Sequence, residues 1–121
     1  MALIVEDSLM KLQEKEPKLL TLDVYRDARG FFLESFSKKI QEDIGMPVGH
    51  FVQDNHSYSK KGVLRGMHYQ TSPGQDKLVY ALLGDIYDVV VDIRKGSPTF
   101  GQWQGFALSS KSPSLLFVPH G

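Results

Sequence analysis

One ten-residue stretch, residues 61–70, combines two side chains that chemistry on a charged small molecule requires. Arg65 and His68 lie three positions apart within it. A guanidinium can hold an anionic substrate, and an imidazole, which titrates near neutral pH, can move a proton. An Arg-x-x-His pair is also common as an ordinary structural contact. The neighbouring residues therefore decide whether the pair is interpreted as catalytic or as structural.

The spacing around His68 matches the start of a cupin-type metal site. Such sites have a glycine, five residues and then His-x-His, with a carboxylate four or five positions further on. Gly62 and His68 fit this frame, but Gln70 stands at the second histidine position and Gln75 at the carboxylate position. Amides are poor ligands for transition metals. The residues therefore predict a cupin-like barrel with no metal and no other cofactor, in which His68 is a base instead of a ligand.

The elements that must position these residues are mostly strands. Alternating apolar and polar residues predict strands at residues 20–24, 31–36, 50–58, 63–70, 78–83, 85–93, 103–107 and 115–118. A turn signal at residues 27–30 makes the first two a hairpin. Residues 37–44 predict a short helix with Ile40 and Ile44 on one face, and Gly45 ends it. Short strands at even spacing predict an all-β fold, a double-sheet jelly roll with one short helix near residues 37–45.

The length of 121 residues fits one domain. Residues 1–18 are expected to be an N-terminal extension, in which Asp7 or Ser8 caps a short helix that Pro17 ends. Residues 19–121 are expected to form the cupin-like domain. The run from Asp85 to Arg94 places Asp88, Asp92 and Arg94 on one face of a strand. Such a face either lies outside the barrel or lines a wet pocket. We expect the outside, because buried carboxylates are costly unless they are paired.

Composition excludes several classes of function. Fourteen basic residues balance fourteen acidic ones, which argues against a general nucleic-acid binder. The absence of cysteine excludes disulfides and thiolate metal sites. No apolar run reaches the length of a membrane span, and the first residues lack the basic start of a signal peptide. A cytoplasmic protein without nucleic-acid or membrane partners is therefore expected.

Several segments together resemble the dTDP-4-dehydrorhamnose 3,5-epimerase family. They occur in the family's order and are residues 27–36, 51–59, 62–70, 74–79, 88–94 and 97–101. The resemblance covers residues 20–121. It implies a cupin jelly roll, and a homodimer in which an N-terminal strand pairs with the partner subunit. It also implies a substrate that is a 4-keto-6-deoxyhexose carried on dTDP, epimerised at C3 and C5 on the way to dTDP-L-rhamnose.

The resemblance also implies roles for individual residues. Protons beside the ketone are acidic, so epimerisation needs a base, an acid and a group that stabilises the enolate. His68 resembles the family's base, and Lys77 resembles its enolate stabiliser. The remaining expected residues bind the substrate: Arg65 and Arg29 at the diphosphate, Phe32 and Glu34 at the nucleotide of the same or the neighbouring subunit, and Gln53 and Asn55 at the diphosphate or sugar.

Each of these residues also has an ordinary structural interpretation. A lysine at a strand start is commonly a solvated charge, Arg29 and Gly30 form a plain turn, and asparagine is common in turns. Phe31 and Phe32 are neighbours on a strand, so one of them is expected to face the core. His50 and His56 are expected to be structural.

In the resembled family a Pro-x-Gly turn is followed by a histidine and further strands. Pro119, His120 and Gly121 supply the turn, and the family's acid, a tyrosine, and the aspartate that pairs with the base lie beyond it. The domain at residues 19–121 is therefore expected to be incomplete at its C-terminal side, the first two-thirds of an epimerase chain. Such a chain would hold a base without its partner acid.

Other functions stay open at the level of sequence. A 5-only or 3-only epimerase, or a ketoisomerase acting on the same substrate, would use the same ketone chemistry. A non-catalytic module that binds sugar nucleotides or mediates dimerisation would explain the missing acid. A metal-dependent cupin oxygenase is disfavoured by Gln70 at a ligand position.

Overall fold

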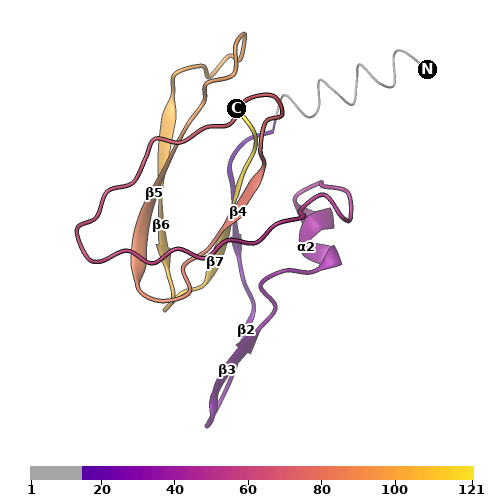
Figure 1. Cartoon of the computed structure of the whole chain (residues 1–121). Coiled ribbons are helices and arrows are strands. Elements are labelled where there is room, and N and C mark those ends of the chain that lie inside the picture. The colour runs from indigo at the N-terminus through magenta and orange to yellow at the C-terminus, as the bar shows by residue number, and fades with distance from the viewer. Residues whose placement is uncertain (1–14) are drawn as a thin grey trace.

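The computed structural model describes residues 15–121, and in them seven strands and one short helix follow one another along the chain (Figure 1). The helix expected near Asp7 and Ser8 lies outside the described residues. The strands form a three-stranded sheet of order β1-β7-β4 and two two-stranded sheets, β2-β3 and β5-β6. All pairings are antiparallel. The all-β prediction with one short helix is therefore confirmed.

The central sheet places strand β7 between two partners. Strand β7 (Ser114–Val118) pairs with β1 (Lys18–Thr21) on one side and with β4 (Lys77–Val79) on the other. Leu20 lies opposite Leu115, and Leu78 lies opposite Phe117. Because β1 and β4 are distant in sequence, β7 joins the beginning of the domain to its middle.

Strand β7 sends its side chains alternately to two apolar clusters. Phe117 joins Ile44 and Met46, with Leu20, Phe51 and Leu78 packed around them. Leu116 joins the second cluster, on the other face of the sheet, with Phe106 and Leu108 of strand β6. The alternation of a strand thus builds one core against the helix and a second core against the β5-β6 sheet.

The second sheet consists of β5 (Asp85–Val91) and β6 (Trp103–Ser109), and it packs over the central sheet. Asp88 lies opposite Phe106, and Val90 lies opposite Gln104. Two sheets packed face to face in this way form the cupin-like jelly roll that the sequence predicts. No helix among residues 15–121 has the length and apolar character that crossing a membrane requires.

Helix α2 (Lys38–Asp43) begins and ends as its sequence predicts. The Ser37 side chain accepts a hydrogen bond from the Ile40 amide, which caps the start of the helix. Gly45 adopts a φ of 74° just after the helix, a conformation that glycine takes without strain. Ile44 packs into the first cluster, so the helix covers one face of the central sheet.

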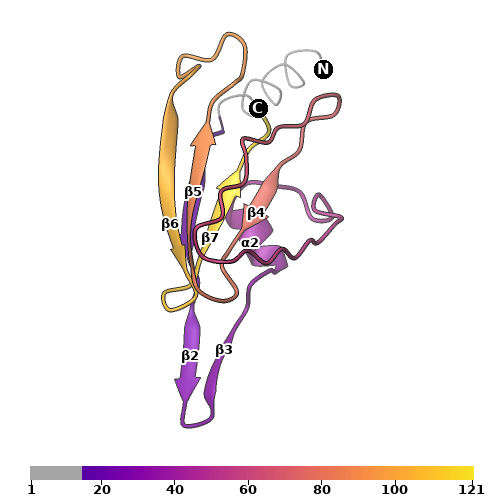
Figure 2. The same ribbon diagram turned by 60° about the vertical axis from the view of Figure 1, so that its left-hand side comes forward.

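The β2-β3 hairpin projects away from the packed sheets. Strands β2 (Val24–Asp27) and β3 (Gly30–Leu33) pair around the predicted turn, and Figures 1 and 2 show the hairpin extending beyond the body of the molecule. Phe31 and Phe32 are 59% and 65% exposed. The expectation that one of the two faces the core is wrong, because the hairpin reaches past both clusters.

Residues 51–76 form a long irregular segment without a strand. Strands were expected at residues 50–58 and 63–70, and both predictions are wrong. A strand needs a neighbour to pair its backbone groups, and within residues 15–121 these segments pair with none. Apolar side chains along the segment are left in solvent, with Leu64 94% exposed and Val52 89% exposed.

Candidate active site

Lys77 begins strand β4 and lies on the face that looks toward the β5-β6 sheet. Its register partner is Val118, and Val79, two residues further along β4, packs into the second cluster together with Val118. Lys77 is half-buried. Among the described residues no protein acceptor takes a hydrogen bond from its ammonium, so its three N–H donors are available to a ligand.

Asp88 faces the same space from strand β5. Val90, two residues further on, packs into the second cluster, and Asp88 lies opposite the buried Phe106. Burial raises the pKa of the Asp88 carboxyl, and the positive charge of Lys77 opposes that rise. The expectation that this face lies outside the barrel is wrong at Asp88 and Val90, although Ile86, earlier on the same face, is exposed like Tyr87 on the opposite face. A nearby cation offsets part of the cost that disfavoured an inward carboxylate.

His68 and three of the predicted binding residues lie in the irregular segment at 51–76, and all four are exposed. Arg65 donates from Nε to the Ser59 hydroxyl at 2.8 Å and from a terminal nitrogen to the Tyr58 carbonyl at 2.9 Å. The Gln53 amide donates to the Asn55 side-chain oxygen at 3.1 Å. The segment thus collects a base candidate, a guanidinium and two amides on one solvent-facing stretch of chain.

Three other predicted residues lie on or next to the projecting hairpin. Arg29 is in its turn and donates from two side-chain nitrogens to the Asp27 carboxylate, at 3.1 and 2.6 Å. Phe32 is on strand β3 and Glu34 follows it, both exposed. The hairpin extends away from the sheets that carry Lys77 (Figure 2), so the structure divides the predicted site residues between two regions.

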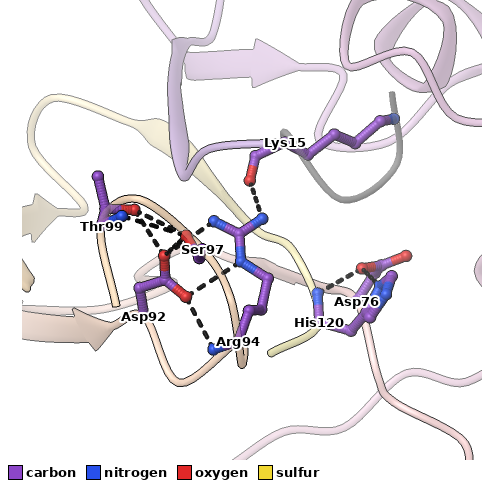
Figure 3. Close-up of polar contacts among 7 residues, drawn as sticks. All are labelled: Lys15, Asp76, Asp92, Arg94, Ser97, Thr99 and His120. Atoms are coloured by element: carbon purple, nitrogen blue, oxygen red, sulfur yellow. Dashed lines mark hydrogen bonds and ion pairs between the residues drawn. The ribbon is translucent and has the colours of Figure 1, made fainter. Parts of the chain in front are cut away.

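Asp76, which precedes Lys77, holds two imidazoles and one backbone amide. Its carboxylate contacts His120 Nδ1 at 3.0 Å and the His120 amide at 2.6 Å (Figure 3). It also contacts His50 Nε2 at 2.7 Å, and its side chain is only 6% exposed. Burial alone would raise the pKa of Asp76, but these three hydrogen bonds together lower it. The Asp76 clasp, as we call Asp76, His50 and His120, fixes the residue beside Lys77.

Sequence patterns contain little sign of the Asp76 clasp. His50 was expected to be structural, which fits, and His120 was identified only as the variable residue of a turn. Gly74 carried the available signal: a Cβ atom placed there would lie 2.8 Å from Cβ of His120. A glycine close to the start of β4 therefore marks a close approach of two segments.

A second polar cluster surrounds Asp92, just after β5. Its carboxylate accepts from Arg94, from the Ser97 hydroxyl and from the Thr99 hydroxyl, and Arg94 also donates to the Lys15 carbonyl at 2.8 Å (Figure 3). The Arg94 guanidinium and these hydroxyls hold the pKa of Asp92 far below its ordinary value. The hydrogen bonds of the Asp92 carboxylate therefore stabilise the turn at residues 94–99.

The described part of the chain contains no group of three histidine, aspartate or glutamate side chains placed to hold a metal ion. Cavities of about 390 and 180 Å³ are lined in part by residues 16 and 17, and neither is lined by His68 or Lys77. The candidate site lies outside both of these cavities. It consists of a half-buried ammonium with a carboxylate in the space between two sheets, and an exposed imidazole on the segment that enters β4.

Fold and site define a cupin-like jelly roll with acid–base side chains. The model of the dTDP-4-dehydrorhamnose 3,5-epimerase family matches residues 11–121, and the chain belongs to this family. The dTDP-4-dehydrorhamnose 3,5-epimerase of Shigella flexneri is 54% identical over 108 residues, which cover 88% of this chain and 56% of that protein. The chain thus spans about half the length of the curated relatives it matches.

Solved structures agree with the assignment. An epimerase from Legionella pneumophila in complex with dTDP-4-keto-L-rhamnose matches with a TM-score of 0.83 and 50% identity, covering 90% of this chain and 58% of that one. The Bacillus anthracis dTDP-4-dehydrorhamnose 3,5-epimerase with TDP and PPi bound matches with a TM-score of 0.81 and 49% identity, covering 88% of this chain and 61% of that one. The resemblance noted in the sequence is therefore confirmed.

Proposed function

We propose that the protein is an isomerase that epimerises dTDP-4-dehydro-6-deoxy-D-glucose at C3 and C5, giving dTDP-4-dehydro-L-rhamnose. The family match over residues 11–121 is the observation that carries this proposal. Residues 19–121 are the part of the cupin-like domain that carries the proposed base and the proposed enolate stabiliser. The protein acts in the cytoplasm on a nucleotide sugar, as a homodimer.

His68 is the proposed base. It removes the proton at C3 or C5, and the electron pair left behind moves onto the C4 oxygen to form an enolate. Its exposed imidazole is accessible to a substrate, and it lies on the segment that leads into Lys77. A proton delivered to the opposite face of the carbon by a general acid, a tyrosine in the resembled family, completes inversion. A proton returned from solvent to the same face only exchanges the hydrogen.

Lys77 is the proposed enolate stabiliser. Its ammonium points into the space between the sheets and keeps its donors free of protein acceptors in the described chain, so it can donate to the C4 oxygen as negative charge develops there. An electrostatic donor in a site partly shielded from water is more effective than the same donor in bulk solvent.

The remaining predicted residues bind the diphosphate and the nucleotide. Arg65 is held by Ser59 and Tyr58, which fixes the guanidinium for phosphate oxygens. Gln53 and Asn55 supply neutral hydrogen bonds. Arg29, Phe32 and Glu34 lie on or beside a hairpin that projects from the body, which supports their contacting the nucleotide in a neighbouring subunit.

The test is hydrogen exchange on the substrate. The chain is incubated with dTDP-4-keto-6-deoxyglucose in heavy water, and deuterium at C3 and C5 is measured by NMR and mass spectrometry. We expect incorporation with the unchanged chain and its loss in His68→Asn, with His56→Asn as the matched control. Equal exchange in His68→Asn would place the base elsewhere.

A non-catalytic module that binds sugar nucleotides is the second candidate, since the chain spans about half the length of its relatives. Calorimetric titration with dTDP separates the two candidates. Binding of dTDP without deuterium incorporation supports the binding module. Absence of both binding and exchange contradicts both candidates.

A further inference from the structure

Strands β4 and β5 each place one charged residue at the edge of the same apolar cluster. Val79 of β4 and Val90 of β5 both pack against Phe106, Leu108 and Leu116. Side chains two positions apart on a strand lie on the same face. Lys77 and Asp88, each two residues before one of these valines, therefore both face the space between the sheets.

The register of the neighbouring strands supports this placement. Lys77 lies opposite Val118, which belongs to the second cluster, and Asp88 lies opposite Phe106. Both charged residues are half-buried. A lone carboxylate beside Val90 and Phe106 would be costly, and so would a lone ammonium beside Val118. The positive charge of Lys77 reduces the cost of burying the Asp88 carboxylate.

We propose that Asp88 is a positioning residue, which holds the Lys77 ammonium in the space between the two sheets without occupying its hydrogen-bond donors. The two side chains form no direct ion pair within the described chain, yet the charge of Lys77 acts on Asp88. Attraction at this longer range orients the ammonium and leaves its N–H groups for a substrate oxygen. Asp92, the next acidic residue on this face, cannot serve in this way because Arg94, Ser97 and Thr99 already bind it.

The pair can be tested without any substrate. Carbon-13 NMR of the aspartate carboxyls follows the titration of Asp88 in the unchanged chain and in Lys77→Met, Lys77→Arg and Lys95→Met. Removal of the Lys77 charge is expected to raise the pKa of Asp88 further, and Lys77→Arg is expected to keep it near its original value. Lys95 is exposed in the turn after β5 and serves as the control, with no expected effect. An Asp88 titration that is the same in Lys77→Met and in the unchanged chain overturns the proposal.

The catalytic meaning of the pair rests on the proposed function and has its own test. In Asp88→Asn the rate of deuterium incorporation at saturating substrate is expected to fall about 10- to 100-fold with little change in KM, because the donor is misplaced more than binding is lost. Asp88→Glu is expected to keep part of the rate that Asp88→Asn loses. Asp85→Asn is the matched control and is expected to exchange hydrogen at the rate of the unchanged chain. Unchanged exchange in Asp88→Asn contradicts the positioning role. If the unchanged chain exchanges no hydrogen, the proposed function fails, and the carboxyl titration still decides whether Asp88 holds Lys77.

Discussion

Asp76 and His50 are joined by a 2.7 Å contact between a carboxylate oxygen and Nε2, although 26 positions separate them in the chain. Asp76 also binds His120 through its amide and its ring, 44 positions away. One carboxylate thus joins the loop that follows helix α2, the start of strand β4 and the end of the described chain. Because Lys77 follows Asp76 directly in the chain, the Asp76 clasp also fixes the backbone position of Lys77.

Removal of the clasp is expected to destabilise the fold. Asp76→Ala leaves the His120 amide and two imidazoles without their acceptor, and the expected loss is about 1–3 kcal/mol in the free energy of unfolding. Urea denaturation followed by circular dichroism measures it. Asp54→Ala changes an exposed aspartate in the irregular segment and should have almost no effect. Equal midpoints for the two variants would contradict a stabilising clasp.

The clasp also predicts a dependence of stability on pH. The folded-state pKa of Asp76 is below its ordinary value of 3.8, so its contribution is complete above 3.8 and is lost as the pH falls through the lowered value. Unfolding midpoints of the unchanged chain and of Asp76→Ala should therefore converge on acidification below 3.8. Asp92 and Asp27 are present in both proteins, which cancels their contributions in the difference. A difference that grows in acid would reverse the sign of the linkage.

Gly74 is expected to be required for the close approach of His120. A methyl group in Gly74→Ala would meet the His120 side chain at 2.8 Å and push it away from Asp76. The expected cost is about 1–3 kcal/mol. A double-mutant cycle with His120→Gly provides the control, because that variant has no Cβ to collide with. Gly74→Ala should cost clearly less in the His120→Gly background.

Asp92 is expected to matter for stability and little for the proposed chemistry. Asp92→Ala removes the Asp92 carboxylate from the half-buried Arg94 and the acceptor of the Ser97 and Thr99 hydroxyls, which are both 2.5 Å away. The loss in unfolding free energy is expected to be about 1–3 kcal/mol. Asp85→Ala, at the exposed start of β5, is the matched control. Thermal denaturation of the two variants compares them directly.

The exposed apolar side chains of the irregular segment predict strong binding of a hydrophobic dye. Leu64 is 94% exposed, so Leu64→Ser should weaken the fluorescence of the dye ANS and change stability by less than about 0.5 kcal/mol. Leu116 is fully buried between the sheets, and Leu116→Ala should cost about 2–5 kcal/mol. Dye binding that is the same in Leu64→Ser would show that other residues bind the dye.

Local signals in the sequence predicted the elements that local interactions build. Ser37 caps helix α2, Gly45 ends it, and the turn at residues 27–30 forms the hairpin. The prediction of strands at residues 50–58 and 63–70 was wrong, because the alternation of apolar and polar residues describes only which side chains a strand could bury. Whether a strand forms depends on a partner elsewhere in the chain, and the pattern does not contain that information.

The candidate site was predictable in its residue types and less so in its geometry. His68, Arg65 and Lys77 carry recognisable chemistry at a recognisable spacing. The inward position of Asp88 was missed because burial of a carboxylate looks unfavourable until Lys77, on another strand, is known to face it. Asp76 was missed for the same reason, since its partners His50 and His120 come from distant segments.

The alternation of strand β7 leaves the protein intolerant of a change in length at that place. Leu116 and Phe117 serve different clusters on opposite sides of one sheet. A single-residue deletion between Ser114 and Leu116 would turn each following side chain to the opposite side. The aromatic ring would then meet the β5-β6 sheet, and the leucine would meet the helix. Neighbouring side chains can repack around a single substitution in β7, whereas a register shift of one residue would disrupt both apolar clusters at once.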